Sequence, residues 1–252
     1  MAQTLKQKQI IIPLNKDATY LGAYKLVGGN LPSNVLHDKY LVETNEWKQL
    51  SKEGYYEAWA KEIIVYPAMN KKFQKGKDVV DGNWIFDKES MPQEAVGKDR
   101  VALFIKEPII KEDGGKVIIS AKQEEIVVLQ NFLQKDGWGK VDEATRMPFE
   151  SKNLDSLNED QKRYLWRRGD ESVRPLARNA YYYDNRRDVY ADWGRVDALG
   201  VARVGSEEVA EKISASAKVN ELKALVHDAK ASLSEQSERM KKIDKLVQEL
   251  GL

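Results

Sequence analysis

The chain has 252 residues, with 41 basic and 40 acidic side chains for a formal net charge of +1, and 42% of its residues are hydrophobic. This composition is typical of a globular protein with a proper core, and it excludes wholesale disorder. The balanced charge argues against a dedicated nucleic-acid coat protein, which usually carries a basic excess. There are no cysteines, so disulfides, thiolate metal sites and cysteine nucleophiles are excluded. The sequence shows neither a secretory signal nor an apolar run long enough to cross a membrane, and we therefore expect a cytoplasmic protein.

Residues 1–140 predict a mainly antiparallel, β-rich body with a few helices, and hence an α+β fold. Short runs rich in Ile, Val and aromatic residues recur between turn signals, and they predict strands over 10–14, 20–27, 63–66, 84–86, 101–105 and 117–120. Asp113-Gly114-Gly115 lies between two such runs and predicts a hairpin. We expect one helix that begins at Asn45, carries Trp47 and Leu50 and can reach Trp59, and a second helix over 122–134.

The type of basic residue divides the chain more clearly than hydropathy does. Residues 1–140 contain 20 Lys and one Arg, whereas residues 163–203 contain nine Arg and no Lys. Between them, residues 141–162 form an acidic stretch with little to bury, which we interpret as a connector. Lys returns in residues 204–252. We therefore expect four parts: the body, the connector, an extended contact segment rich in Arg and aromatic residues, and a C-terminal part.

The segment 163–203 is the candidate binding surface. Arg tolerates desolvation, stacks on rings and pairs bidentately with carboxylates, and protein interfaces are enriched in Tyr, Trp and Arg and depleted in Lys. The segment lacks the apolar periodicity that would let it form a core of its own. The predicted interface residues are Tyr164, Trp166, Arg167, Arg168, Arg174, Arg178, Tyr181, Tyr182, Tyr183, Arg186, Arg187, Tyr190 and Trp193.

Three interpretations of this segment stay open. The first is contact with another protein, and the second is an intramolecular wrap that covers the β-rich body. The third is nucleic-acid binding, with Tyr on bases and with Arg167, Arg168, Arg186 and Arg187 on phosphates. Six interleaved acids and the low net charge favour protein contact over nucleic acid.

The C-terminal part, residues 204–252, predicts a long helix. Residues 206–250 contain no Gly or Pro, and apolar residues recur in them with heptad spacing, which is typical of a coiled coil. The helix can pack against another subunit or along the body of its own chain, and both alternatives stay open. The residues of the heptad seam are Leu222, Val226, Ala229, Leu233, Gln236, Met240, Ile243, Val247 and Leu250.

The sequence carries no recognisable catalytic or metal-binding signature. Its two histidines are His37, which we place in a loop, and His227, on the C-terminal helix, and neither stands in a triad or zinc pattern. The Gly-Lys pairs lack the other residues of a phosphate-binding loop. We therefore expect no enzymatic activity, no cofactor and no bound metal. A carboxylate-dependent hydrolase stays a remote alternative, because 40 acidic residues offer many pairs.

The layout of the chain is a β-rich body, a connector, an Arg- and aromatic-rich segment and a heptad-patterned helix. In this layout it is similar to small structural subunits of virus particles, such as neck or capsid-associated proteins of tailed phages. The resemblance rests on no specific motif. It implies a non-enzymatic assembly protein, in a virion or in the cytoplasm, that binds copies of itself or other subunits. Nucleic-acid association through the 163–203 segment is the alternative function.

Overall fold

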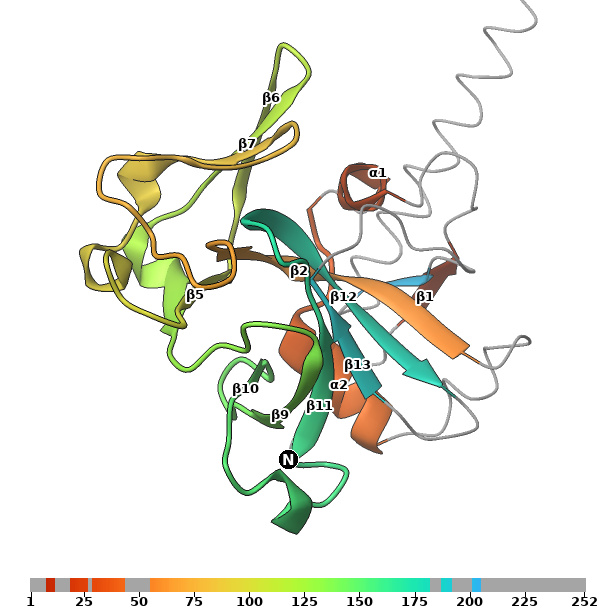
Figure 1. The fold of residues 1–252 in the computed structure, drawn as a ribbon. Helices are drawn as coiled ribbons and strands as arrows, with labels where there is room; N and C mark the ends of the chain where they lie inside the picture. Colours follow the sequence, from red (N-terminus) through yellow and green to blue (C-terminus); the bar gives the residue numbers. More distant parts are fainter. Residues whose placement is uncertain are drawn as a thin grey trace, which may run out of the picture. The chain divides into compact units, whose positions relative to one another are not determined.

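The computed structural model describes residues 8–11, 19–26, 29–43, 55–181, 187–191 and 201–204. The chain divides into two compact units, Met1–Glu207 and Glu208–Leu252, and all of the described residues belong to the first. They form a sheet of eight strands, a sheet of four strands and a two-stranded ribbon, together with two α-helices (Figure 1).

The eight-stranded sheet is the frame on which the candidate site is built. Its strands are antiparallel to their neighbours except for β11 and β13, which are parallel. The longest pair, β2 with β12, shifts register between Pro175 and Ala177, and this bulge accommodates a proline that cannot donate a ladder hydrogen bond. The strand order is β10 (Pro148–Phe149), β9 (Gly137–Val141), β11 (Lys162–Trp166), β13 (Arg187–Tyr190), β12 (Ser172–Tyr181), β2 (Tyr55–Tyr66), β5 (Ala102–Ile105) and β8 (Ile126–Leu129).

The two smaller sheets are built from short strands. The β6–β7 hairpin of the four-stranded sheet turns at Gly114 and Gly115, which both have positive φ, a conformation that glycine adopts without strain. Four short 3-10 turns lie between the strands. The four-stranded order is β3 (Val79–Asp81), β4 (Trp84–Phe86), β7 (Lys116–Ser120) and β6 (Ile109–Asp113), the ribbon pairs β1 (Lys8–Ile11) with β14 (Val201–Val204), and the turns are η1 (Lys88–Ser90), η2 (Gln93–Ala95), η3 (Gln123–Glu125) and η4 (Leu154–Ser156).

Both α-helices begin directly after a hydroxyl side chain that caps the first turn. Thr19 Oγ1 accepts a hydrogen bond from the backbone N–H of Gly22, 3.1 Å away, at the start of α1 (Tyr20–Leu26). Ser33 Oγ accepts one from the N–H of Leu36, 3.2 Å away, at the start of α2 (Asn34–Glu43). Such caps satisfy N–H groups that have no partner inside the helix. The strand predicted over 20–27 is therefore wrong, because this segment is helix α1.

The buried hydrophobic side chains form one main cluster on the eight-stranded sheet and a smaller one under α2. The smaller cluster consists of Tyr40, Leu41, Ala58 and Ala180, and it fixes α2 against β2 and β12. The main cluster draws on strands from across the sheet and on the loops that flank β8 and β9, which explains why sheet and loops pack as one body. Its members are Ala60, Ile64, Tyr66, Ala102, Phe104, Leu129, Phe132, Leu133, Met147, Leu165, Leu176, Val189 and Ala191.

The predicted α+β fold class is wrong. In the described residues 40% lie in strands and 18% in helical turns, and only two α-helices are present, so this part of the protein is predominantly β. The helix predicted over 122–134 is replaced by the turn η3 and the strand β8. Each residue of β8 pairs with β5. A short apolar run fits a buried strand as well as a helix, and here pairing with β5 decides between them.

The local strand signals were more reliable than the helix signals. The strands predicted over 63–66, 84–86, 101–105 and 117–120 and the hairpin at Gly114 are confirmed, and the prediction over 10–14 overlaps β1. Trp59 lies in strand β2 and not in a helix, and its ring contacts that of Tyr20 with the ring centroids 5.8 Å apart. The other residues of that predicted helix, Asn45, Trp47 and Leu50, lie outside the described residues.

Two further predictions concern the second half of the chain. Residues 163–181 are not an extended segment over a β-rich body, because β11 and β12 are themselves interior strands of the main sheet. Strand pairing also joins residues on both sides of the boundaries predicted at 140 and 162, since β9 pairs with β11 and β2 with β12. The predicted C-terminal helix, with its seam from Leu222 to Leu250, lies outside the described residues, and no long helix occurs within them.

Candidate functional site

Strand β11 carries the side chains of interest on two opposite faces, because successive residues of a strand point to opposite sides. Arg163 and Leu165 point toward α2 and the core, and neither has exposed surface. Tyr164 and Trp166 point to the other face and are partly exposed. The first face holds a buried ion network, and the second holds a row of aromatic rings.

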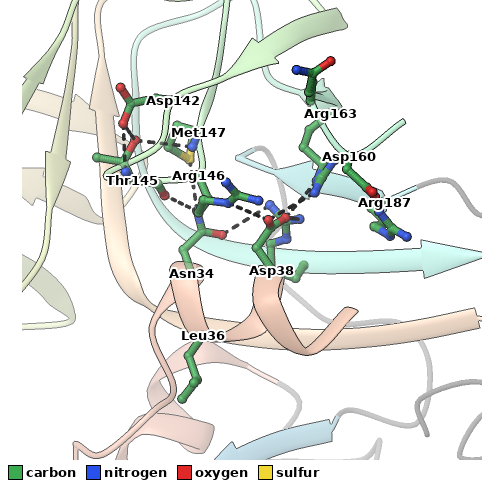
Figure 2. A network of polar contacts seen from close by, with 12 residues as sticks. Asn34, Leu36, Asp38, Asp142, Thr145, Arg146, Met147, Asp160, Arg163 and Arg187 are labelled. Carbon is green, nitrogen blue, oxygen red and sulfur yellow. Dashed lines mark hydrogen bonds and ion pairs between the residues drawn. The ribbon is translucent and has the colours of Figure 1, made fainter. Parts of the chain in front are cut away.

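Asp38 of α2 is the centre of the ion network (Figure 2). Arg163 Nε donates to Asp38 Oδ1 at 2.8 Å and Arg163 Nη2 to Oδ2 at 3.1 Å. Arg178 Nη2 donates to Oδ1 at 2.5 Å, and Arg146 Nε donates to Oδ2 at 2.7 Å. The side chains of Asp38, Arg163 and Arg178 have no exposed surface. The network therefore joins α2 to β11, to β12 and to the loop after β9 in the interior of the protein.

Asp38 compensates part of the positive charge in this network. Burial by itself raises the pKa of the Asp38 carboxyl, but Arg178, Arg163 and Arg146 outweigh burial and hold the pKa of Asp38 well below its usual range. Burial lowers the pKa of Arg178 to about 10, against the opposing effect of Asp38, so Arg178 is still charged at neutral pH. One carboxylate thus neutralises part of the charge of three guanidinium groups, and every one of them depends on it.

Hydrogen bonds to Asn34 and Glu62 fix the start of α2 beside this network. The backbone N–H of Asn34 donates to Glu62 Oε2 at 2.8 Å, and Asn34 Nδ2 donates to the carbonyl oxygen of Thr145 at 2.7 Å. Burial raises the pKa of Glu62 to about 7, although the Asn34 N–H acts in the opposite direction. His37, predicted in a loop, lies in α2 with Nε2 3.1 Å from the carbonyl oxygen of Trp59.

The chemistry of the ion network is structural. A general base needs an unoccupied lone pair and a pKa near the working pH. The two oxygens of Asp38 accept hydrogen bonds from three guanidinium groups, and the low pKa of this carboxyl keeps it ionised. The arrangement therefore connects parts of the fold, and it offers no proton acceptor to a substrate.

Two other arginines of the 163–203 segment are also bound within the chain. Arg167, which is 5% exposed, donates Nη1 to the carbonyl oxygen of Leu133 at 2.7 Å, and its guanidinium lies 4.1 Å from the centre of the Tyr66 ring. Arg174 forms a bidentate ion pair with Asp81 at 2.5 and 2.7 Å. Arg163, Arg167, Arg174 and Arg178 thus all make side-chain contacts within the chain.

The aromatic row consists of Trp138 on β9, Tyr164 and Trp166 on β11 and Tyr190 on β13. Ring centroids are 5.6 Å apart between Trp138 and Tyr164, 4.8 Å between Tyr164 and Trp166, and 5.9 Å between Trp166 and Tyr190, where the rings are stacked. The strand register explains the row, because Trp138 stands opposite Tyr164 and Trp166 stands opposite Tyr190. Cross-strand pairs of this kind stabilise a sheet.

Trp166 is anchored by a hydrogen bond, and three rings of the aromatic row reach the surface. Trp166 Nε1 donates to Asp188 Oδ2 at 2.9 Å, which sets the orientation of the indole. Trp138, Tyr164 and Trp166 are partly exposed, whereas Tyr190 is buried. The row is therefore an apolar surface that continues from Trp166 to the buried ring of Tyr190.

Charged side chains flank the aromatic row. Lys162 Nζ lies 5.6 Å from the centre of the Trp138 ring and pairs with Glu159 at 3.1 Å. Arg187 pairs with Asp160 at 2.5 Å. An open groove of about 520 Å³ borders the row at Trp138, and its other lining residues include Arg100, Asn131, Gln134, Lys135 and Lys152.

The predicted interface residues thus separate into three groups. Tyr164, Trp166 and Tyr190 come together in the aromatic row, Arg187 flanks it, and Arg168 is exposed beside Asp81 and Asp170. Arg167, Arg174 and Arg178 form the group that is bound within the chain. The third group lies outside the described residues or has no described side chain: Tyr181, Tyr182, Tyr183, Arg186 and Trp193.

No family model, curated protein or solved structure matches the chain. In the part of the chain that the structure describes, no group of three or more His, Cys, Asp or Glu residues is placed to hold a metal ion. In the same part, no helix has the length and apolar character to cross a membrane.

Several residues of the site were not predicted from the sequence, among them Asp38, Asn34 and Trp138. Asp38 and Asn34 lie on α2, and Ser33 directly after Pro32 was an available signal for the start of that helix. Trp138 lies between two glycines, and this sequence reads as a turn, although it forms β9. The pairing of β9 with β11, which places Trp138 in the row, has no local signal.

Proposed function

We propose that this chain is a non-enzymatic structural subunit of a large multi-protein assembly, such as a virus particle, and that it binds a neighbouring protein through the aromatic row. The observation that carries the proposal is the row itself. Trp138, Tyr164 and Trp166 present partly exposed rings side by side on one face of the main sheet. Trp and Tyr are the residues most often found to dominate the binding energy of protein interfaces.

The fixed geometry of the rings favours tight binding. A side chain that is already held in one rotamer loses little conformational entropy when a partner covers it. The stacking of Trp166 on Tyr190 and its hydrogen bond to Asp188 hold its ring before any partner arrives. Trp166 therefore loses less conformational entropy when a partner binds than a mobile surface side chain would lose.

The surroundings of the row have the anatomy of an interface. Interfaces combine an apolar centre with a polar rim, and the charged pairs Lys162–Glu159 and Arg187–Asp160 flank the rings. The groove of about 520 Å³ beside Trp138 is a concave surface in which side chains of a partner can be received. The virus particle is proposed as the assembly because the layout of the sequence is similar to that of virion subunits. One part of that layout is corrected, since residues 163–181 form strands of the main sheet and not an extended segment.

The contacts of Arg167 and Arg187 support protein binding over the alternative of nucleic-acid binding through these two side chains. That alternative uses Arg167, Arg168, Arg186 and Arg187 on phosphates. Arg167 is buried on the Tyr66 ring, and Arg187 is engaged by Asp160. Guanidinium groups that are already paired or buried contribute little to phosphate binding.

The proposal is tested by the mass of the native complex isolated from the source organism with a tagged chain. We expect a mass many times that of the monomer for the wild type. Trp166→Ala removes a ring from the centre of the row, and we expect it to weaken the contact by about 2 kcal/mol or more, roughly 30-fold in Kd. The complex then dissociates on dilution and gives a smaller mass.

Trp84→Ala is the matched control, because Trp84 is a partly exposed tryptophan of the four-stranded sheet and does not belong to the row. We expect this variant to keep the mass of the complex. Trp166→Phe, which retains an aromatic ring, is expected to keep most of the affinity. A monomeric wild-type protein, or the same loss of mass in Trp84→Ala as in Trp166→Ala, would contradict the proposal.

A further inference from the structure

The loop between β2 and β3 carries a concentrated positive charge. Residues 70–77 contain four lysines, Lys71, Lys72, Lys75 and Lys77, and no acidic residue, and all four lysines are exposed. We call this segment the lysine loop. In a chain whose total charge is +1, such a concentration is a local feature with its own electrostatic potential.

The backbone of the lysine loop is held in one conformation. Phe73 is 3% exposed, and its carbonyl oxygen accepts a hydrogen bond from the N–H of Gly97 at 3.0 Å. At the start of the loop, the N–H of Met69 donates to the carbonyl oxygen of Gly169 at 2.8 Å, and the N–H of Asn70 donates to Gln134 Oε1 at 3.0 Å. The lysines are therefore displayed from a preorganised support.

Two residues with positive φ shape the ends of the loop. Asn70 has φ of 62° and Gly76 has φ of 68°. Asparagine and glycine are the residues that adopt this left-handed conformation most readily. The turn at Gly76 separates Lys75 from Lys77 along the surface, and the loop thus spreads its cations.

The lysine loop borders a groove of about 470 Å³. Lys71, Lys72 and Lys77 line it, with Asp78 and Glu171 as the acidic lining residues. Asp78 is engaged, since its Oδ1 accepts a hydrogen bond from the N–H of Lys88 at 2.9 Å.

The cations of the loop are largely uncompensated. Lys72 forms an exposed ion pair with Asp99 at 3.3 Å, and a pair of this kind contributes little. Among the described residues, no ion pair involves Lys71, Lys75 or Lys77. These ammonium groups repel one another and are free to meet an anion.

We propose that the lysine loop binds the phosphate backbone of a double-stranded nucleic acid without reading its sequence. Lysine is a point charge on a flexible stem, which suits contact with phosphates and gives no base discrimination. Phe73, the aromatic residue among those lining the groove, is buried. Unpaired bases bind by stacking on exposed rings. The groove has no exposed ring on which the bases of a single strand could stack, so it favours a duplex.

The concave shape argues against a membrane as the polyanion. A bilayer is broad and flat, and it reaches the side chains that protrude from a protein surface. Lys71, Lys72 and Lys77 line a groove instead, which is large enough for phosphates that protrude from the ridge of a duplex backbone. Lys71, Lys72 and Lys77 neither belong to the aromatic row nor line the groove at Trp138, so their substitution leaves the rings of the row unchanged.

Fluorescence anisotropy with a labelled duplex of mixed sequence, followed across a salt gradient, tests the proposal. If the four lysines each neutralise one phosphate, wild-type affinity falls about 150-fold between roughly 50 and 200 mM salt. The triple variant Lys71→Gln, Lys75→Gln, Lys77→Gln retains one contact, and its affinity falls only about 4-fold over the same range. These substitutions are at exposed positions, and we expect the variant to keep its melting temperature.

The matched control is Lys106→Gln, Lys111→Gln, Lys116→Gln, which removes the same charge from exposed lysines on and beside the β6–β7 hairpin. We expect it to keep the salt dependence of the wild type. The proposal is overturned by any of four results: no binding to duplex at low salt, an equal effect of both triple variants, tighter binding to a single strand of the same length, or binding only to vesicles of phosphatidylcholine and phosphatidylserine.

Discussion

Asp38 is the residue on which the interior of the described unit most depends. Arg163 and Arg178 are fully buried, and each directs its guanidinium at the Asp38 carboxylate. A buried ion pair adds little net stability compared with an apolar pair of the same size, but removing one partner leaves an uncompensated buried charge. The stability of the fold is therefore sensitive to the removal of the Asp38 carboxylate.

Asp38→Asn keeps the size of the side chain and removes its charge. We expect the free energy of unfolding at pH 7, measured with chemical denaturant, to fall by about 3–5 kcal/mol, because two buried guanidinium groups lose their counter-charge. Asp170→Asn is the control, since the Asp170 side chain is 84% exposed and lies 3.9 Å from Arg168. The control is expected to change stability by no more than about 0.5 kcal/mol, and equal effects of the two substitutions would refute the role given to Asp38.

Strand β9 shows how one position without a side chain lets two strands approach. A Cβ atom on Gly139 would lie 2.8 Å from the carbonyl oxygen of Phe149, 2.9 Å from its nitrogen and 2.9 Å from Pro148 Cβ. Two of these atoms belong to the backbone of β10, so they cannot move away as the end of a flexible side chain can. The same strand holds Trp138 in the aromatic row and pairs with β11, and the glycine thus supports the row.

Gly139→Ala is expected to lower the free energy of unfolding by about 1–3 kcal/mol, the range typical of overpacking. Gly137→Ala in the same strand is the control, because a Cβ there meets no atom within 4 Å, and little change is expected. Denaturant titration of both variants provides the measurement. If Gly137→Ala destabilises as much as Gly139→Ala, the cause is strand propensity and not the approach of β10.

At the scale of the described unit, two buried carboxyls give opposite pH dependences. Asp38 has a lowered pKa when folded, so its stabilising contribution is present above about pH 4, its pKa when unfolded, and is lost as the pH falls below that value. Glu62 has a pKa raised to about 7 when folded. The folded protein then binds a proton that the unfolded chain releases near pH 4.5, so stability falls as the pH rises toward 7 and is constant above it.

These two carboxyls together place the maximum of stability near pH 4. Between pH 5 and pH 8 the wild type is expected to lose about 3 kcal/mol through Glu62. Glu62→Gln keeps an acceptor for the N–H of Asn34 and removes the titration, so its stability is expected to stay constant over this range. Denaturant unfolding of both proteins at the two pH values is the measurement, and parallel pH profiles would show that Glu62 is not responsible.

Part of the secondary structure of this protein can be predicted from local sequence alone. The sequence predicts the strands at 84–86 and 117–120 and the turn at Gly114, because β-branched runs and paired glycines favour strand and turn conformations at their own positions. Tyr164, Trp166 and Tyr190 were also identified, since the residue types that dominate interfaces are visible in composition. Whether these residues bind a protein stays a prediction.

The tertiary structure decided what each of these side chains does. Arg163 is 125 residues from Asp38 along the chain, and no periodicity relates a cation to a carboxylate at that distance. The same holds for Trp138, which enters the aromatic row because β9 pairs with β11. The sequence determined which residues tolerate burial or stacking. Strand pairing decided which of them are buried and which reach the surface, because the energy of pairing depends on neighbours that only the folded chain supplies.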